Sequence, residues 1–186
     1  MTPTLILLGG SLREHSRSRA LLRTSLALAK ERGMDAELLD LFELDLPMFL
    51  PDRTFEDYPI EKRETIARVL AAYRRAHAMI WASPTYHGTV SGVFKNALDF
   101  AELLAQDARP YLRGCAVGII AVNDTTTLTA MSHCVRELRA WLAPTQIMAT
   151  EQSFSAMNDL IDDRVKKRLA RQVDELVSFV VSHPVS

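Results

Sequence analysis

Hydroxyl and guanidinium side chains are concentrated in the stretch GGSLREHSRSR, residues 9–19, directly after an apolar run. Basic side chains at the N-terminus of a helix oppose its macrodipole, at a cost of about a few tenths of a kcal/mol each. An anion placed among them would reverse that sign, and serine hydroxyls could donate to its oxygens beside the free helix N–H groups. The glycine pair would let the backbone turn tightly near the ligand. The stretch therefore predicts a phosphate-binding loop built from Ser11, Arg13, Ser16, Arg17, Ser18 and Arg19. Taken alone, the loop is also compatible with a serine helix cap and surplus arginines.

A second unusual loop, SPTYHGTVSG, follows another apolar run further along the chain. Pro84 fixes the turn, and Tyr86 and His87 offer ring edges or faces. Gly88 and Gly92 leave room for a flat ligand to approach the backbone. In open α/β sheets, ligands bind beyond the carboxyl ends of the strands, near the point where the strand order reverses. A planar aromatic group could lie on this loop. A histidine such as His87, taken singly, is more often an ordinary loop residue, but its position beside the predicted switch point makes a ligand contact about as plausible.

The elements that must position these loops are short apolar runs alternating with longer stretches of helical period. This alternation indicates a parallel sheet covered on both faces. We expect an α/β, flavodoxin-like, three-layer doubly wound fold with a five-stranded parallel sheet in the order 2-1-3-4-5. One domain would span residues 1–186. The expected strands are Thr4–Leu8, Ala36–Leu39, Ala78–Ala82, Ala116–Val122 and Ile147–Ala149.

Five helices are expected between and after these strands. The first ends at Gly33, and the second follows Pro59. The fourth carries an apolar stripe from Leu128 to Leu142, with Pro144 as its stop. The last helix runs from about Asn158 to His183.

The third expected helix, Ser91 to Ala105, is apolar nearly all round. Only Lys95, Asp99 and Glu102 make a clearly polar stripe, so we expect other surfaces to cover the helix on both sides. We predict a homodimer or homotetramer with its contact on this helix, the alternative being one deeply buried helix in a monomer. The long segment Leu41 to Pro59 is typical of a functional or interface loop.

Composition excludes several classes of function. The net charge of -1 gives no global attraction to nucleic acid or to an anionic membrane. The two cysteines, Cys115 and Cys134, have neither disulfide-framework nor zinc-ligand spacing, so no metal is expected. No apolar stretch is long enough to span a bilayer, and we expect a cytoplasmic protein. The first loop also lacks the G-x-G-x-x-G pattern of a dinucleotide site.

The two loops together resemble the NADPH-dependent FMN reductase family, which includes flavin reductases, azoreductases and quinone or chromate reductases on a flavodoxin-like fold. The resemblance rests on GGSLREHSRSR and SPTYHGTVSGVFKNALDF and covers essentially the whole chain. It implies FMN as cofactor and NADPH or NADH as co-substrate. By this resemblance the FMN phosphate is held by Ser11, Arg13, Ser16 and Ser18. The isoalloxazine ring would be lined by Pro84, Thr85, Tyr86, His87 and Gly88.

The loop after the fourth expected strand departs from the family. Members usually carry a Gly-Gly-rich loop there, whereas this chain reads AVNDTTTLTAM, residues 121–131, without glycine. Asn123 and Thr125 could instead hydrogen-bond the ring or the ribityl chain. Alternatively, Asp124 or Thr125 caps the following helix.

The resemblance implies an oxidoreductase in which hydride passes from NAD(P)H to flavin N5. Electrons then pass to a small acceptor, such as free flavin, a quinone or an azo compound, with ping-pong kinetics. Because the flavin carries the difficult chemistry, we expect no catalytic side chain. Two alternatives stay open: a non-enzymatic electron carrier of flavodoxin type and an interaction domain without flavin. Carriers are commonly strongly acidic, whereas this chain is near neutral.

Overall fold

A parallel β-sheet forms the centre of the computed structural model, which describes residues 2–183. Its strands follow the order β2-β1-β3-β4-β5, and β6 pairs separately with β4. The predicted flavodoxin-like order is therefore confirmed, with the last expected strand preceded by a short additional one. The strands are β1 Thr4–Gly9, β2 Asp35–Asp40, β3 Ala78–Pro84, β4 Ala116–Val122, β5 Trp141–Leu142 and β6 Ile147–Ala149.

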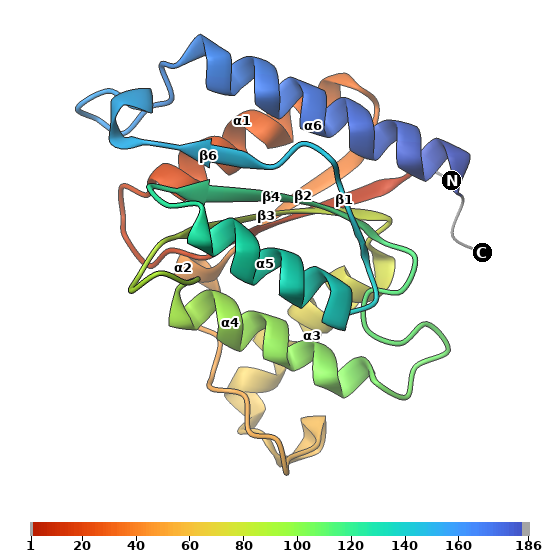
Figure 1. The fold of residues 1–186 in the computed structure, drawn as a ribbon. Coiled ribbons are helices and arrows are strands. Elements are labelled where there is room, and N and C mark those ends of the chain that lie inside the picture. The colour runs from red at the N-terminus through yellow and green to blue at the C-terminus, as the bar shows by residue number, and fades with distance from the viewer. Residues whose placement is uncertain (1, 184–186) are drawn as a thin grey trace.

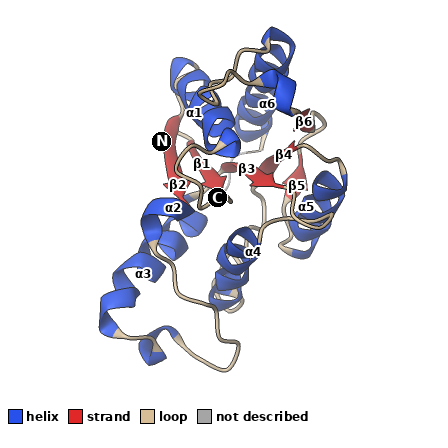
Figure 2. Ribbon diagram, turned by 90° about the vertical axis from the view of Figure 1, so that its left-hand side faces the viewer, coloured by secondary structure: helices blue, strands red, loops and turns tan. Residues whose placement is uncertain are grey.

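Helices cover both faces of the sheet (Figures 1 and 2). The α-helices are α1 Arg17–Glu31, α2 Leu41–Leu44, α3 Ile60–Arg75, α4 Gly92–Asp99, α5 Thr126–Glu137 and α6 Asp163–Ser182. The short 3-10 helices are η1 Phe55–Asp57, η2 Phe100–Leu104 and η3 Glu151–Ser153. Helices α1 and α6 lie on one face, and α3, α4 and α5 lie on the other.

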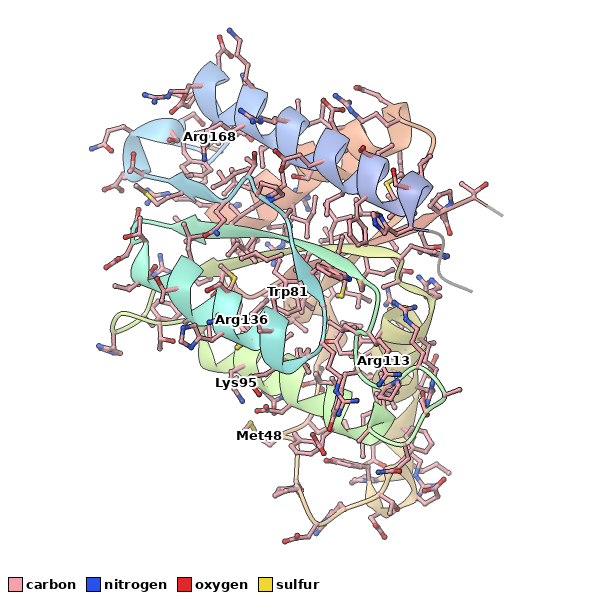
Figure 3. The ribbon with its side chains drawn as sticks, turned by 45° about the vertical axis from the view of Figure 1, so that its right-hand side comes forward. Met48, Trp81, Lys95, Arg113, Arg136 and Arg168 are labelled. Carbon is pink, nitrogen blue, oxygen red and sulfur yellow. The ribbon has the colours of Figure 1, made fainter. Side chains whose placement is uncertain are left out.

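Two hydrophobic cores lie on opposite faces of the sheet. Leu5 and Leu7 of β1 belong to the core under α1 and α6, whereas Ile6 and Leu8 belong to the other core. Successive side chains of a strand point to opposite faces, so a strand covered on both sides needs an unbroken apolar run. Figure 3 shows Trp81 of β3 inside the molecule and Met48 on the outer surface of the segment after α2.

The fourth predicted helix is correct at its start and wrong at its end. Helix α5 stops at Glu137 because Arg139 adopts a left-handed conformation, with φ of 61°. The N–H groups of Arg139 and Ala140 then donate to the carbonyls of Arg136 and Val135, which is the Schellman pattern of a helix end. Leu142 consequently lies in β5, and Pro144 is not the stop.

The last strand of the sheet is broken into two pieces. Strand β5 pairs with the start of β4 and β6 with its end. The N–H of Ala143 still donates to the carbonyl of Val117, at 2.9 Å, and residues 144–146, which include Pro144, interrupt the pairing. The side-chain amide of Gln172 in α6 donates to the carbonyls of Ile119, at 3.3 Å, and Thr145, at 2.7 Å. Gln172 therefore fills the gap in the hydrogen-bond ladder that the break leaves.

The last helix begins later than predicted. Asp162 accepts hydrogen bonds from the N–H groups of Arg164 and Val165, at 2.8 and 3.2 Å, so α6 starts at Asp163. Asn158, with φ of 61°, lies in the loop before it. Among residues 2–183, no helix is both long enough and apolar enough to cross a membrane.

The third predicted helix corresponds to α4 followed by η2. Its apolar side chains on both faces, including Phe94, Ala97 and Phe100, are buried within this one chain. Phe49 and Tyr58 pack their rings against Phe100, with ring centroids 5.5 and 5.7 Å apart. Most of the apolar surface from which we predicted a contact between copies is thus covered by the chain itself, and Val93 near the start of α4 is left half-buried.

Candidate functional site

The loops after β1, β3, β4 and β6 meet at one edge of the sheet, on the left in Figure 1. Gly9, the last residue of β1, is level with Ala82 of β3. Val122, at the end of β4, is level with Pro84 of β3 and Ala149 of β6. The strand register therefore brings loops that are distant in sequence to one place, which is where open α/β sheets bind ligands.

A cavity of about 190 Å³ lies among these loops. Nine residues singled out from the sequence line it: Ser11, Arg13, Ser16, Arg17, Ser18, Pro84, Thr85, Tyr86 and Asn123. His15, Val122 and Asn158 complete the lining. No carboxylate is among these described residues, whereas two of them are arginines. The composition of the lining suits an anion.

The three serines of the first loop are buried at the cavity wall. The Ser16 hydroxyl accepts a hydrogen bond from the N–H of Arg19, at 3.2 Å, and lies 2.9 Å from the Ser18 hydroxyl. Ser16 is therefore the N-cap of α1, and it lines the cavity as well. The Ser11 hydroxyl accepts from the N–H of Arg13, at 3.2 Å, which folds the loop back on itself.

The glycine pair before these serines is needed for close packing against α4 and not for a tight turn of the backbone. Gly9 is the last residue of β1, and neither Gly9 nor Gly10 has a positive φ. A Cβ atom on Gly10 would lie 2.7 Å from the Cβ of Phe94, so glycine lets α4 approach the loop. The Ser91 hydroxyl then donates to the Gly10 carbonyl, which joins the first loop to the second.

The arginines of the first loop have separate roles. Arg19 is buried and forms an ion pair with Asp40, and it donates to the carbonyls of Arg13, at 3.1 Å, and Glu14, at 2.6 Å. Arg17 donates to Glu151, at 2.6 Å. Both are paired with carboxylates from elsewhere in the chain, but only Arg19 is withdrawn from the cavity, whereas Arg17 is part of its lining.

Arg13 remains a candidate for binding an anion, as the sequence predicts. Its side chain is exposed at the cavity, and no hydrogen bond or ion pair engages it among residues 2–183. The N–H groups of Arg17 and Ser18 open α1 and have no acceptor within the helix. The lining therefore includes one free guanidinium, three serines and the two residues, Arg17 and Ser18, whose N–H groups open α1.

The second loop is a tight hairpin turn. Tyr86 and Thr89 exchange backbone hydrogen bonds of 3.0 and 3.1 Å. The two central residues, His87 and Gly88, have φ of 51° and 77°, as a type I′ turn requires. His87 and Gly88 are exposed beside the cavity and do not line it. The Thr85 hydroxyl, which lies 2.7 Å from that of Thr127, ties this loop to α5.

The loop after β4 contains residues for both predicted roles, contact with the cofactor and capping of the following helix. Asn123, with φ of 79°, lines the cavity. The Asp124 carboxylate accepts from the Thr126 N–H at 2.8 Å, and hydrogen bonds from Thr126 lower the pKa of Asp124. Thr125 is exposed, forms no side-chain cap and does not line the cavity. The capping role therefore belongs to Asp124.

Sequence reasoning missed Asn158, which reaches the cavity from the loop after β6. Its side-chain oxygen accepts from Arg17 Nε, at 2.9 Å, and its side-chain nitrogen donates to the carbonyl of His15, at 3.3 Å. No local pattern marks this residue, because only the tertiary fold brings it to the first loop.

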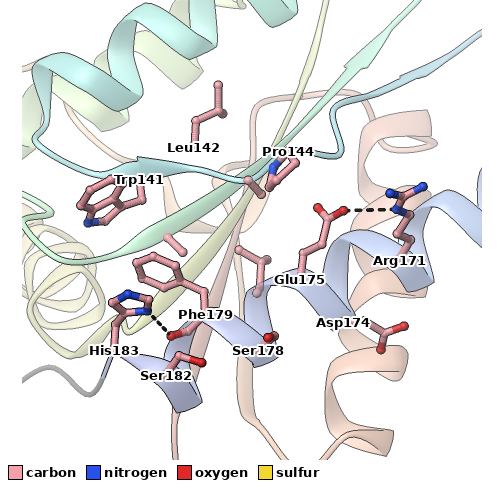
Figure 4. A pocket seen from close by; sticks show the side chains of 13 residues that line it. Trp141, Leu142, Pro144, Arg171, Asp174, Glu175, Ser178, Phe179, Ser182 and His183 are labelled. Atoms are coloured by element: carbon pink, nitrogen blue, oxygen red, sulfur yellow. Dashed lines mark hydrogen bonds and ion pairs between the residues drawn. The ribbon is translucent and has the colours of Figure 1, made fainter.

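A larger cavity, of about 620 Å³, lies between β5 and the second half of α6 (Figure 4). Trp141, Leu142 and Phe179 make it largely apolar. Its charged side chains pair with neighbours, as in the dashed contact between Arg171 and Glu175. This cavity contains Ala116, the first residue of β4, and therefore lies at the opposite end of the strand from the candidate site.

A doubly wound parallel sheet with a cavity at its carboxyl edge, lined by hydroxyl and basic side chains, is the architecture of a flavodoxin-like protein. The chain belongs to the NADPH-dependent FMN reductase family, whose model matches residues 3–158. Membership confirms the predicted enzyme class, an NAD(P)H-dependent flavin oxidoreductase, and its cofactor FMN. The non-enzymatic carrier is thereby disfavoured.

Curated relatives agree with this assignment. An FMN-dependent NADPH-azoreductase of Staphylococcus haemolyticus (strain JCSC1435) is 28% identical over 189 residues, covering 96% of each chain. The enzyme of the same name from Staphylococcus aureus (strain USA300) is 29% identical over 180 residues, covering 94% of each chain.

Solved structures share the fold. FerB, a flavoenzyme NAD(P)H:(acceptor) oxidoreductase from Paracoccus denitrificans, matches with a TM-score of 0.75 and 21% identity, over 98% of this chain and 99% of its own. A flavodoxin from the domain Archaea matches with a TM-score of 0.60 and 11% identity, over 95% of this chain and 99% of its own.

Proposed function

We propose that the cavity of about 190 Å³ binds the phosphate end of FMN. The observation that carries this proposal is the lining of the cavity. It contains the buried serines Ser11, Ser16 and Ser18 and the unpaired Arg13 guanidinium, and no carboxylate is among the lining residues that the structure describes. Charge-assisted hydrogen bonds from arginine and helix N–H groups are the usual means of holding a phosphate. The donor set therefore fits the group.

The flavin ring needs more room than this cavity supplies, since cofactor sites usually measure about 300–1,000 Å³. We place the ring on the exposed turn beside it, against Pro84, Thr85, Tyr86, His87 and Gly88. Asn123 and Thr125 are available from the third loop. The turn is rigid because Tyr86 and Thr89 bond each other, and Thr85 anchors it to α5. These residues would orient the ring without taking part in the chemistry.

Bound FMN would supply hydride acceptance and onward electron transfer, which no side chain here provides. We propose that the reduced nicotinamide and then a small acceptor use the exposed side of the turn in succession, which gives ping-pong kinetics. The names of the two staphylococcal relatives support an azo compound as acceptor. Free flavin and quinones are the other candidates, and we propose that the reaction takes place in the cytoplasm, where reduced nicotinamide is supplied.

Charge reversal tests the location of the phosphate. Arg13→Glu should raise the dissociation constant for FMN by about a hundred-fold or more, because about 3 kcal/mol of charge-assisted bonding is lost and repulsion is added. Lys30→Glu makes the same charge change at the exposed far end of α1 and should leave FMN binding unchanged. Riboflavin, which lacks the phosphate, should bind both variants alike. Equal FMN affinities for the two variants would refute the proposed site.

Turnover tests the reaction. The purified protein should be yellow and should oxidise NADPH or NADH when an azo dye, a quinone or free FMN is present. Parallel lines in double-reciprocal plots would support the ping-pong order. A yellow protein that oxidises neither nucleotide with any acceptor would instead support a flavodoxin-type carrier, and a colourless protein that takes up no FMN would support an interaction domain.

We also propose that the chain forms a homodimer or homotetramer through the N-terminal end of the helix Ser91 to Ala105. An apolar groove of about 520 Å³ lies there, and its lining includes Val93, the exposed Leu12 and Met48. Light scattering should give a multiple of the chain mass, and Met48→Glu should lower it. Met157→Glu, an equally exposed methionine elsewhere, is the control. A monomeric wild-type protein would disprove the contact.

A further inference from the structure

The loop between β6 and α6, residues 150–162, is folded on itself, and we call it the clasp. Phe154 and Leu160 form an isolated antiparallel bridge. The N–H of Ser155 donates to the carbonyl of Asp159 at 2.8 Å, and the Ser155 hydroxyl accepts from the N–H groups of Met157 and Asp159. This number of internal bonds makes the clasp an ordered unit beside the candidate site.

Arg17 joins the clasp to the start of α1. Its guanidinium donates to Glu151, at 2.6 Å, and to Asn158, at 2.9 Å. It also lies over the Phe154 ring, 5.8 Å from the centroid. Three contacts made by one side chain hold residues 151, 154 and 158 of the clasp against the first loop.

Asn158 is held in one orientation by these contacts. Arginine only donates hydrogen bonds, so the side-chain oxygen of Asn158 must face Arg17. The side-chain nitrogen then faces His15, to whose carbonyl it gives one of its two hydrogens. Asn158 also lines the cavity, and its second amide hydrogen has no acceptor among the described residues.

We propose that Asn158 binds the FMN phosphate by donating its second amide hydrogen to a phosphate oxygen, and that Arg17 is a positioning residue that acts through Asn158 by fixing its amide. This inference rests on the proposed location of FMN. It adds the loop after β6 to the three loops already assigned to the cofactor.

Asn158→Asp separates this role from a purely structural one. Aspartate keeps an oxygen for Arg17 and strengthens that pairing, but it replaces the donor with a negative charge facing the phosphate. FMN should dissociate from this variant at least about ten-fold faster, followed by the fluorescence of the released flavin. Hydrogen exchange of the clasp should change less than in Arg17→Ala, because the bond to Arg17 is kept and only the bond to the His15 carbonyl is lost. Riboflavin affinity should not change.

Arg17→Ala tests the indirect role of the arginine. The clasp should exchange its amide hydrogens faster, and FMN should again dissociate about ten-fold faster. In the double variant Arg17→Ala/Asn158→Ala, the effects should not add, because both changes remove the same positioned donor. Met157→Ala, an exposed neighbour in the clasp, is the matched control and should match the wild type in both measurements.

Two failures can be told apart. If the wild-type protein binds FMN and Arg13→Glu weakens it, but Asn158→Asp dissociates at the wild-type rate, the inference about Asn158 is overturned while the site stands. If Arg13→Glu binds FMN as tightly as the wild type does, the site itself is wrong and the inference fails with it.

Discussion

Arg19 and Asp40 form a buried ion pair beneath the loop after β1, joining the first turn of α1 to the end of β2. Their side chains are only 8% and 7% exposed. Arg19 Nη2 donates to Asp40 at 3.2 Å, and its Nη1 atom holds two loop carbonyls. The pair therefore ties the shape of the loop to the sheet, and the arginine that we had expected to bind an anion positions the backbone instead.

Replacing either Arg19 or Asp40 alone should lower the free energy of unfolding more than replacing both residues together. Arg19→Met or Asp40→Leu alone leaves an unpaired charge in a buried place, and each should lower the free energy of unfolding by about 3–5 kcal/mol. The double variant Arg19→Met/Asp40→Leu should regain a part of that loss, because no buried charge remains. Urea unfolding measures all three. Single variants within about 1 kcal/mol of the wild type would show that the pair is solvated.

Gly88 should resist substitution because of its backbone conformation. At φ of 77° alanine is strained by about 1–2 kcal/mol, so Gly88→Ala should lower the free energy of unfolding by that amount and weaken FMN binding. Gly92→Ala provides the control, since Gly92 opens α4 without a positive φ and has no atom within 4 Å of a new Cβ. Thermal unfolding that ranks the two variants equally would contradict the type I′ turn.

His77 should make the fold sensitive to acid. Burial, aided by the nearby Arg109, lowers the pKa of His77 below its ordinary value of 6.5. The unfolded chain therefore binds a proton more readily than the folded one, so this contribution to stability is complete above about pH 6.5 and is lost as the pH falls. Urea midpoints at about pH 7.5 and about pH 5.5 should differ less for His77→Asn than for the wild type. An identical difference would assign the acid sensitivity to other groups.

Gln172 should contribute to the stability of the fold through the hydrogen bonds of its side-chain amide and not through the volume that it fills. Gln172→Met keeps the shape but leaves the carbonyls of Ile119 and Thr145 without their donor, which costs about 1–3 kcal/mol for each group that stays dry. The same change at the exposed Gln106 should have no measurable effect. Equal urea midpoints for the two variants would mean that water replaces the amide.

The sequence was sufficient for the sheet and for most of the cavity lining. Apolar runs covered on both faces are recognisable without tertiary information, and Ser11 and Pro84 follow directly from the ends of such runs. The pairing of charges was not predictable, because Asp40 is distant in sequence from Arg19 and only the strand register brings them together. Asn158 was missed for the same reason.

The prediction of the end of α5 failed because the residue that ends the helix in a left-handed conformation is not glycine. The apolar stripe continued to Leu142, whereas Arg139 with its positive φ had already ended α5. Glycine at such a position is a visible signal, as Gly33 was for α1, but arginine is not.

The broken last strand also bears on how the protein behaves at high concentration. An unpaired sheet edge invites a strand from another molecule, and short, interrupted edges discourage it. Strands of two and three residues, separated by a bulge that contains Pro144, offer an incoming chain no continuous row of partners. At the opposite edge, Glu37 of β2 is engaged by Arg68 and Arg75. The border formed by β5 and β6 is thus a poor template for strand exchange, and the ion-paired charge of Glu37 on β2 is the kind of edge residue that discourages it.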